Sequence, residues 1–108
     1  MTTTSYYLSG PMTGLPEYNY PYFNTVAAAL RLWGYTIVNP AELNDSTVPF
    51  EQCLRTDIKA LCDCTGIILL SGWERSKGAH LELHIAHRLG LSIQTLNDFL
   101  KERNHDPL

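Results

Sequence analysis

The sequence lacks the features that mark nucleic-acid-binding, membrane-spanning and secreted proteins. Eight Lys and Arg residues stand against eleven Asp and Glu, for a net charge of −3, so no basic surface for a nucleic-acid backbone is expected. No run approaches the roughly 18–20 consecutive apolar residues that a transmembrane helix needs. The start, Met-Thr-Thr-Thr-Ser, lacks the basic and apolar regions of a signal peptide. We therefore expect a cytoplasmic protein that handles small molecules, with neither nucleic acid nor membrane as a partner.

Cysteine is also scarce. The three residues, Cys53, Cys62 and Cys64, are an odd number, which argues against a disulfide framework. Cys53 and Cys62 fall in a helical pattern as small apolar residues, so we expect no metal site and no cofactor. His80, His84 and His87 share one helix face, where a surface metal site is conceivable but a solvated face is the simpler reading.

Two common nucleotide-binding motifs are missing as well. The chain contains no G-x-x-x-x-G-K-[ST], and no G-x-G-x-x-G follows its first strand pattern. A phosphate loop of the Walker type and a dinucleotide-binding turn are therefore not expected.

What the chain does have is a regular alternation of strand and helix patterns, read as a single domain over residues 1–108. Apolar runs predict strands at 6–8, 35–38, 67–70 and 91–93. Helical periodicity and end signals predict helices at 21–33, 50–62, 77–89 and 96–103. Residues 12–20 form a loop with aromatic side chains, residues 43–49 a polar connector, and the polar tail after 103 is expected to fray.

This order predicts an α/β protein: a flavodoxin- or Rossmann-like three-layer sandwich with a four- to five-stranded parallel sheet and a strand order near 2-1-3-4. Ligands of such sheets bind beyond the carboxyl ends of the strands. That rule gathers the segments 9–10, 39–40 and 71–73 at one rim.

Glu82 is the residue that stands out. On a helical wheel that starts at His80, it lies at about 200°, inside the apolar stripe that holds Leu81, Ile85, Ala86 and Leu89. Ionised carboxylates are rarely buried unless they are paired or take part in chemistry. A functional role is one interpretation of this position; the alternatives are a partly exposed Glu at the edge of the stripe and a Glu that serves the helix N-terminus.

Asp57 is a second carboxylate inside an apolar stripe, on the helix predicted at 50–62 among Phe50, Cys53, Leu54, Ile58 and Leu61. A buried ion pair with an arginine is the structural alternative. Two carboxylates and a tyrosine at one crevice suit cleavage of a glycosidic bond, with one acid as nucleophile and the other assisting proton transfer. Ser76, at the start of a helix, is placed to bind an anion such as phosphate.

Three motifs then suggest a family. The segments Y-L-S-G-P-M-T-G, N-P-A-E and G-W-x-x-S-x-G-A-x-x-E, together with Asp57-Ile58-x-x-Leu61, resemble the nucleoside 2-deoxyribosyltransferase superfamily, and within it the small DUF4406 branch often found in bacteria and phages. The resemblance covers about residues 6–95. It departs from the family where Thr65-Gly66 replaces an Asp that often precedes the third strand.

The resemblance implies a function and roles for particular residues. Glu82 is the implied nucleophile, Tyr7 orients it, Asp57 assists at the base, and Ser76 contacts a 5'-phosphate, as in the related 2'-deoxynucleoside 5'-phosphate N-hydrolases. A homodimer or larger homo-oligomer is also implied. The predicted substrate-binding residues are Ser9, Gly10, Pro11, Met12, Asn19, Phe23, Asn39, Ser71, Gly72, Trp73, Ser76 and Gly78. For Trp73 core packing is an alternative, and for Asn39 turn closing is.

The predicted activity is cleavage, by hydrolysis or transfer, of the N-glycosidic bond of a nucleoside or deoxynucleoside 5'-monophosphate. The alternative from the same residues is a pocket that binds or sequesters a nucleotide or nucleotide-derived signal without turnover. The identity of the base, and ribose against deoxyribose, are left open.

Overall fold

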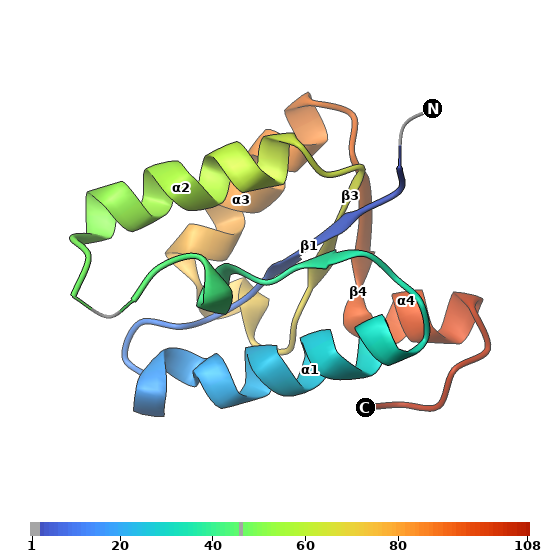
Figure 1. Cartoon of the computed structure of the whole chain (residues 1–108). Coiled ribbons are helices and arrows are strands. Elements are labelled where there is room, and N and C mark those ends of the chain that lie inside the picture. The colour runs from blue at the N-terminus through green and yellow to red at the C-terminus, as the bar shows by residue number, and fades with distance from the viewer. Residues whose placement is uncertain (1–2, 46) are drawn as a thin grey trace.

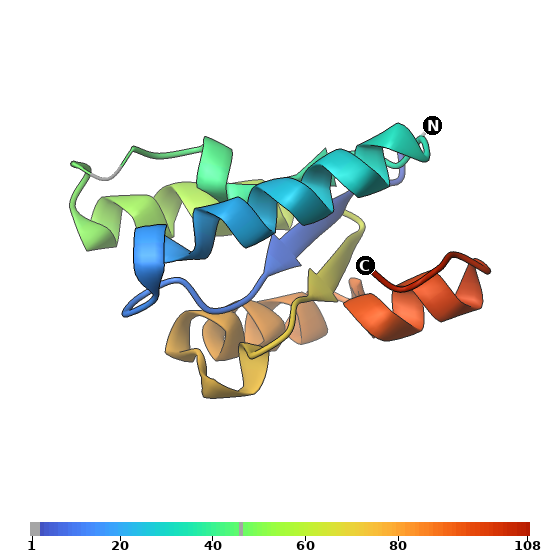
Figure 2. The same ribbon diagram turned by 90° about the horizontal axis from the view of Figure 1, so that it is seen from below.

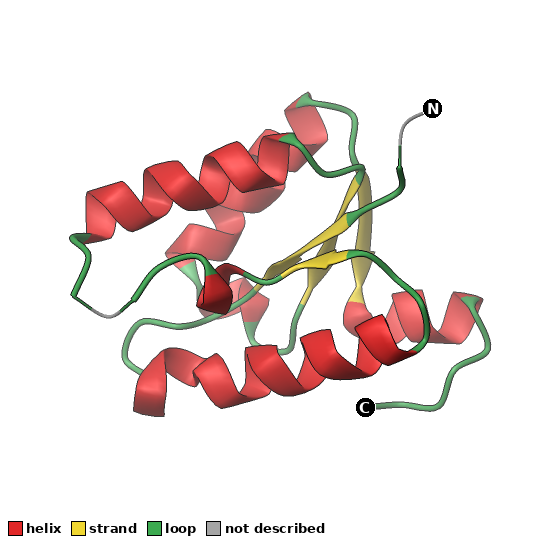
Figure 3. Ribbon diagram, in the orientation of Figure 1, coloured by secondary structure: helices red, strands yellow, loops and turns green. Residues whose placement is uncertain are grey.

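A computed structural model describes residues 3–45 and 47–108 (Figure 1). The first two residues of the Met-Thr-Thr-Thr-Ser start, and Ser46 in the predicted connector, lie outside the described residues. Figure 3 shows the elements by type. They are β1 (Tyr6–Ser9), α1 (Tyr20–Leu32), β2 (Ile37–Val38), α2 (Phe50–Cys62), β3 (Gly66–Leu69), α3 (Lys77–Arg88), β4 (Ser92–Thr95) and α4 (Leu96–Glu102), with short 3₁₀ turns η1 (Pro16–Asn19), η2 (Pro40–Glu42) and η3 (Trp73–Arg75).

The four strands form one parallel sheet in the order β2-β1-β3-β4, which confirms the predicted topology. β1 lies in the middle, paired with β2 from Tyr6 opposite Ile37 and with β3 from Tyr6 opposite Gly66. β3 pairs in turn with β4. The loops after β1, β2 and β3 therefore emerge at one edge of the sheet, as the rim prediction requires.

Helices cover both faces of the sheet and make the predicted three layers. In Figure 1, α2 and α3 lie above the sheet and α1 and α4 below it; Figure 2 gives the view from below. Side chains alternate along each strand, so neighbouring residues enter different layers. Leu8 and Ile68 join the core against α1 and α4, whereas Tyr7 and Ile67 join the core against α2 and α3.

The inward faces of α2 and α3 differ in part from the predicted stripes. On α3 the buried residues are Ala79, Glu82 and Ala86, while Leu81 and Leu89, predicted to face inward, are 38% and 52% exposed. The buried arc thus includes Glu82 and is centred near Ala86. On α2, Phe50 was also predicted to face inward, but it is the first residue of the helix and is 65% exposed.

His105, in the C-terminal tail that was expected to fray, is docked against the rest of the protein. The His105 backbone N–H donates to the Leu100 carbonyl at 2.9 Å, and its ring lies parallel to that of Trp33 with centroids 4.0 Å apart. The Tyr35 hydroxyl lies 2.8 Å from His105 Nε2. The two aromatic partners, Trp33 and Tyr35, come from the segment between α1 and β2. His105 is thus held by aromatic side chains that are distant in sequence.

Two glycines allow the backbone to pass the rim. A Cβ on Gly10 would lie 3.0 Å from the Leu70 Cβ, so only glycine lets the turn after β1 approach the end of β3 this closely. Gly72 has a φ of 90°, a left-handed conformation that favours glycine, and it starts η3. The turn at Gly10 leads from β1 toward α1, and the turn at Gly72 leads from β3 toward α3.

Candidate active site

A cleft of about 710 Å³ lies at the rim, beyond the carboxyl end of β1. It is walled by the loop after β1, the start of α1, the connector before α2, one side of α2, and the first turns of α3. The lining residues are Tyr7, Leu8, Gly10, Pro11, Met12, Thr13, Tyr18, Tyr20, Phe23, Pro40, Asn44, Asp45, Val48, Phe50, Cys53, Leu54, Asp57, Arg75, Ser76, Lys77, Gly78 and Glu82.

Glu82 lies in the wall of this cleft and is held by two hydroxyl groups of β1. Tyr7 Oη donates to Glu82 Oε2 at 2.5 Å, and Ser9 Oγ donates to Oε1 at 2.6 Å. The side chain is buried, with 7% exposure. Because strand residues alternate in direction, Tyr7 and Ser9 lie on the same face of β1 and each reaches one carboxyl oxygen.

Burial raises the pKa of Glu82 to about 7, although the hydrogen bonds from Ser9 and Tyr7 lower it; the nearby charge of Asp57 adds to the rise. Burial also raises the pKa of Tyr7 well above its usual value, helped by the charges of Glu82 and Asp57. Tyr7 therefore remains a protonated donor, while Glu82 is close to half-ionised at neutral pH.

Asp57 lines the same cleft from α2. Its Oδ1 accepts a hydrogen bond from Asn44 Nδ2 at 3.1 Å. Burial raises the pKa of Asp57 to about 6, and the Asn44 hydrogen bond opposes that rise. The arginine partner considered for Asp57 is not seen among the described residues, where the ion pair found joins Arg31 to Glu42.

Cationic and polar groups gather where α3 begins. Ser76 caps the helix: its Oγ accepts from the Ala79 N–H at 3.1 Å. Arg75 and Lys77 flank it, and all three line the cleft. The cleft thus has carboxylates along its α2 and α3 walls and positive charge at the α3 N-terminus, where the helix dipole also favours an anion.

The family described as "Domain of unknown function (DUF4406)" matches residues 4–95. The chain belongs to this family. A solved structure titled "2-desoxiribosyltransferase from Leishmania mexicana" is similar to the chain with a TM-score of 0.68 and 21% identity, over 97% of this chain and 74% of that one. A likeness at this identity shows a shared fold, and this fold confirms the predicted architecture. No curated protein matches the chain.

In this DUF4406 protein, half of the predicted substrate-binding residues line the cleft and half do not. Those in the lining are Gly10, Pro11, Met12, Phe23, Ser76 and Gly78, together with the three predicted catalytic residues Tyr7, Asp57 and Glu82. Outside it are Ser9, Asn19, Asn39, Ser71, Gly72 and Trp73.

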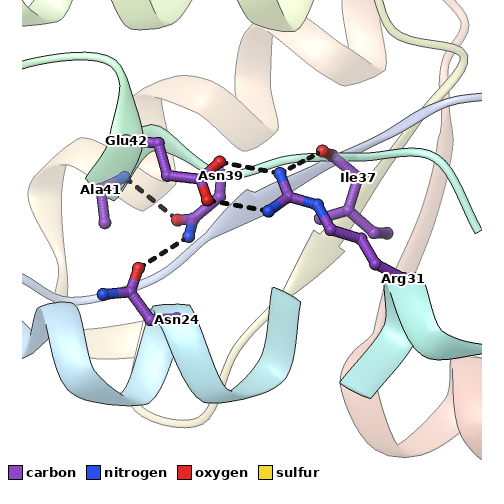
Figure 4. A network of polar contacts seen from close by, with 6 residues as sticks. All are labelled: Asn24, Arg31, Ile37, Asn39, Ala41 and Glu42. Atoms are coloured by element: carbon purple, nitrogen blue, oxygen red, sulfur yellow. Dashed lines mark hydrogen bonds and ion pairs between the residues drawn. The ribbon is translucent and has the colours of Figure 1, made fainter. Parts of the chain in front are cut away.

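Asn39 is outside the lining because its side chain is used within the fold (Figure 4). It is 1% exposed; its Oδ1 accepts from the Ala41 N–H and its Nδ2 donates to Asn24 Oδ1. The turn-closing alternative therefore describes it better than ligand binding. In the same view Arg31 donates to Glu42 and to the Ile37 carbonyl, which ties α1 to β2 and η2.

The other outlying residues also have contacts within the protein or lie on another surface. Asn19 Nδ2 donates to the Pro11 carbonyl at 2.9 Å. Trp73 packs against the α2/α3 core and lies 5.4 Å from the His80 ring, which favours the packing alternative. Ser71 and Gly72 line a separate small hollow with Glu74 and Arg75.

The rim near α1 is conformationally strained. Glu17, Tyr18 and Asn19 have φ values of 52°, 52° and 60°, the left-handed region that side chains with a Cβ rarely adopt. Tyr18 lines the cleft, so the strain lies next to the candidate site, where such conformations are concentrated in proteins.

Several lining residues were not predicted from the sequence: Asn44, Asp45 and Val48 of the connector, and Arg75 and Lys77 beside Ser76. Arg75 and Lys77 adjoin a predicted anion-binding serine, a signal that was available in the sequence. The connector carries no periodicity, so nothing local indicates which of its side chains turns inward.

Among the described residues, no group of three or more His, Cys, Asp or Glu side chains is arranged to hold a metal ion. Cys53, Cys62 and Cys64 are free thiols. His80, His84 and His87 are all exposed on α3. In the part of the chain that is described, no helix has the length and apolarity needed to cross a membrane.

Proposed function

We propose that the protein cleaves the N-glycosidic bond of a nucleoside or deoxynucleoside 5'-monophosphate, by hydrolysis or by transfer to a second base, with Glu82 as the nucleophile. The observation that carries this proposal is a buried carboxylate, oriented through both of its oxygens, in the wall of a cleft with a second carboxylate. The fold shared with a 2-desoxiribosyltransferase supports the choice of a glycosyl bond.

The reaction follows a double displacement. A Glu82 carboxylate oxygen attacks C1' of the sugar as the C1'–N bond breaks, giving a glycosyl ester and a departing base. Protonated Asp57 delivers its proton to the base as the bond electrons move onto it. Water, or a second base, then attacks C1' and releases Glu82, and the proton lost by that nucleophile returns to Asp57.

The pH dependence follows from the two carboxyl groups. Attack needs Glu82 ionised and base departure needs Asp57 protonated, so the active state of the pair holds one proton. With pKa values of about 7 for Glu82 and about 6 for Asp57, the singly protonated pair is most abundant between these values. Its proton lies mostly on Glu82, so the active form, with Glu82 ionised and Asp57 protonated, is the minor form of the pair. We expect a bell-shaped rate profile with a maximum near pH 6–7.

The 5'-phosphate fits the cationic end of the cleft. Ser76, Arg75 and Lys77 supply a hydroxyl and two positive charges at a helix N-terminus, the usual surroundings of a bound phosphate. The aromatic side chains of Tyr18, Tyr20 and Phe50 line the cleft and offer faces for a base to stack on.

A homo-oligomer stays a prediction; Phe50, 65% exposed at the cleft, is an apolar surface that a second subunit would cover.

The second candidate is binding or sequestration of a nucleotide or nucleotide-derived signal without turnover. One observation favours it: a carboxyl group with a pKa of about 7 is protonated in half of the molecules at neutral pH, and a protonated Glu82 holds a ligand but does not attack it. The two functions therefore differ in the fate of the ligand in one and the same cleft.

Mass spectrometry of small molecules separates the two. The wild type is incubated at pH 6.5 with a panel of ribo- and deoxynucleoside 5'-monophosphates, with and without a second free base. Catalysis predicts a released base and, for transfer, a new nucleotide; Glu82→Gln should lower release by about three orders of magnitude or more, as expected for loss of a nucleophile. Glu51→Gln, an exposed acid at the start of α2, is the matched control and should retain full activity.

Unchanged turnover in Glu82→Gln would contradict the assignment of the nucleophile. Recovery of intact nucleotide that nevertheless binds the wild type, measured by calorimetry, would replace the catalytic proposal with sequestration.

A further inference from the structure

Ser9 was predicted to bind substrate, but its surroundings indicate another role. It is 1% exposed and is absent from the cleft lining, and its hydroxyl hydrogen is directed to Glu82 Oε1 at 2.6 Å. We propose that Ser9 is a positioning residue, which holds the Glu82 carboxyl group in one orientation and favours its ionised form. This proposal deepens the proposed function and rests on it for the consequence in turnover.

The geometry of the two donors explains the orientation. A Glu carboxyl group rotates easily about its last bond, because that torsion has a broad energy well. Tyr7 alone would hold one oxygen and leave the other free to move. Ser9, two residues further along the same face of β1, holds the second oxygen, so the carboxyl plane is tied to a strand that is itself paired on both sides.

The charges around Glu82 explain why Ser9 also affects ionisation. The titratable groups that act on it are Tyr7 on β1, a neutral donor, and Asp57 on α2, whose negative charge disfavours a second one. Arg75 and Lys77 line the same cleft, yet no ion pair joins either of them to Glu82 in the described part of the chain. Ionisation is therefore supported by the two hydroxyl donors, and removal of one leaves a single donor against burial and Asp57.

The first test is a titration that does not depend on activity. The carboxyl carbon of Glu82 is followed by ¹³C NMR between pH 4 and 10 in the ligand-free protein, with Glu82→Gln used to assign the signal. Ser9→Ala should move the midpoint to higher pH, and Ser9→Thr, which keeps the hydroxyl, should restore it. The control Thr65→Ala removes a hydroxyl that donates to the Ser5 carbonyl at the opposite end of β1, and should leave the midpoint unchanged.

The second test is kinetic. Ser9→Ala should lower kcat about tenfold or more at pH 7, the loss expected for one hydrogen bond to a charged group, with KM changed by less than twofold. The alkaline limb of its rate profile, which follows the higher of the two pKa values, should move to higher pH. An unchanged NMR midpoint would overturn the proposal, as would a rise in KM at constant kcat, since that result would make Ser9 a substrate contact.

The two proposals fail in different ways. If the wild type releases no base, the proposed reaction is wrong, while the NMR titration still decides whether Ser9 controls Glu82. If Ser9→Ala is poorly folded, Ser9→Cys, which keeps a weaker donor, should give a midpoint above that of the wild type; a midpoint equal to that of the wild type would contradict the proposal.

Discussion

The two ends of the sheet both hold charged side chains among aromatic rings, but they satisfy those charges differently. At the amino end of β1, the Arg103 guanidinium lies 3.8 Å from the Phe99 ring centroid and donates to Tyr6 Oη, Gln94 Oε1 and the Phe99 carbonyl. At the carboxyl end, Glu82 and Asp57 are held by neutral donors alone.

The difference separates a charged group that stabilises the fold from acidic groups that can take part in a reaction. A cation surrounded by rings and acceptors is stabilised in its charged form and has no reason to change it. A buried carboxylate without a cation is destabilised when charged, so its pKa moves toward neutral pH, where it can exchange a proton or attack a substrate. The contacts of Arg103 therefore contribute to stability, and the carboxyl end of the sheet holds the two acids that we propose to be reactive.

Glu82→Gln should have the largest effect on stability, because it removes the buried charge at the carboxyl end of the sheet. The pKa of Glu82 is raised in the folded protein, from 4.5 to about 7, so ionisation lowers stability progressively as pH rises through this range. A shift of this size corresponds to about 3 kcal/mol above pH 7. Gln is neutral and can still hydrogen-bond to Tyr7 and Ser9, so the variant should be more stable than the wild type at pH 8.

The measurement is urea unfolding of both proteins at several pH values. The gain should shrink as pH falls and vanish near pH 4, where the wild-type carboxyl is protonated in the folded and the unfolded state. A variant that is less stable than the wild type at pH 8, or a difference in stability that does not change with pH, would show that burial does not destabilise the ionised form of Glu82.

Arg103→Met tests the opposite end of the sheet. Methionine fills similar space but loses the charge over Phe99 and the bonds to Tyr6 and Gln94, which should lower the free energy of unfolding by about 1–2 kcal/mol. Turnover per folded molecule should not change. Lys101→Met, at an exposed position on α4, is the control and should be near neutral. A loss of activity in Arg103→Met at full folding would mean that the two ends are coupled.

The sequence predicts the sheet and the central acid because both follow from periodicity. The alternation of four strand and four helix patterns specifies a parallel sheet, and the helical wheel turns Glu82 inward, although Leu81 and Leu89 prove to be exposed on that helix. Tyr7 and Ser9 share a face of β1 for the same reason of period, yet only the structure shows that both hydroxyl groups reach one carboxyl group.

The rest depends on contacts between distant segments. Whether Asn39 binds a ligand or closes a turn depends on Asn24, fifteen residues earlier, and on local backbone geometry. The tail docks because Trp33 and Tyr35 meet His105, a contact that no local pattern encodes. The connector residue Asn44 reaches Asp57 across a turn of irregular structure.

Asn44→Ala is the mildest test of the comparison, because it removes one neutral donor from the less buried of the two acids. The hydrogen bond from Asn44 lowers the pKa of Asp57 against the effect of burial, so its loss should raise that pKa further. If Asp57 is the proton donor, the acid limb of the rate profile, which follows the lower of the two pKa values, should move to higher pH. Maximal turnover should fall about fivefold, as expected for a loss of about 1 kcal/mol in positioning.

Thr47→Ala is the control from the same connector, since its hydroxyl donates to Asp45 and not to Asp57. Steady-state rates between pH 5 and 9 decide the matter: equal limbs in Asn44→Ala and Thr47→Ala would mean that the proton on the leaving base does not come from Asp57, and the carboxyl end of the sheet would then hold one reactive acid instead of two.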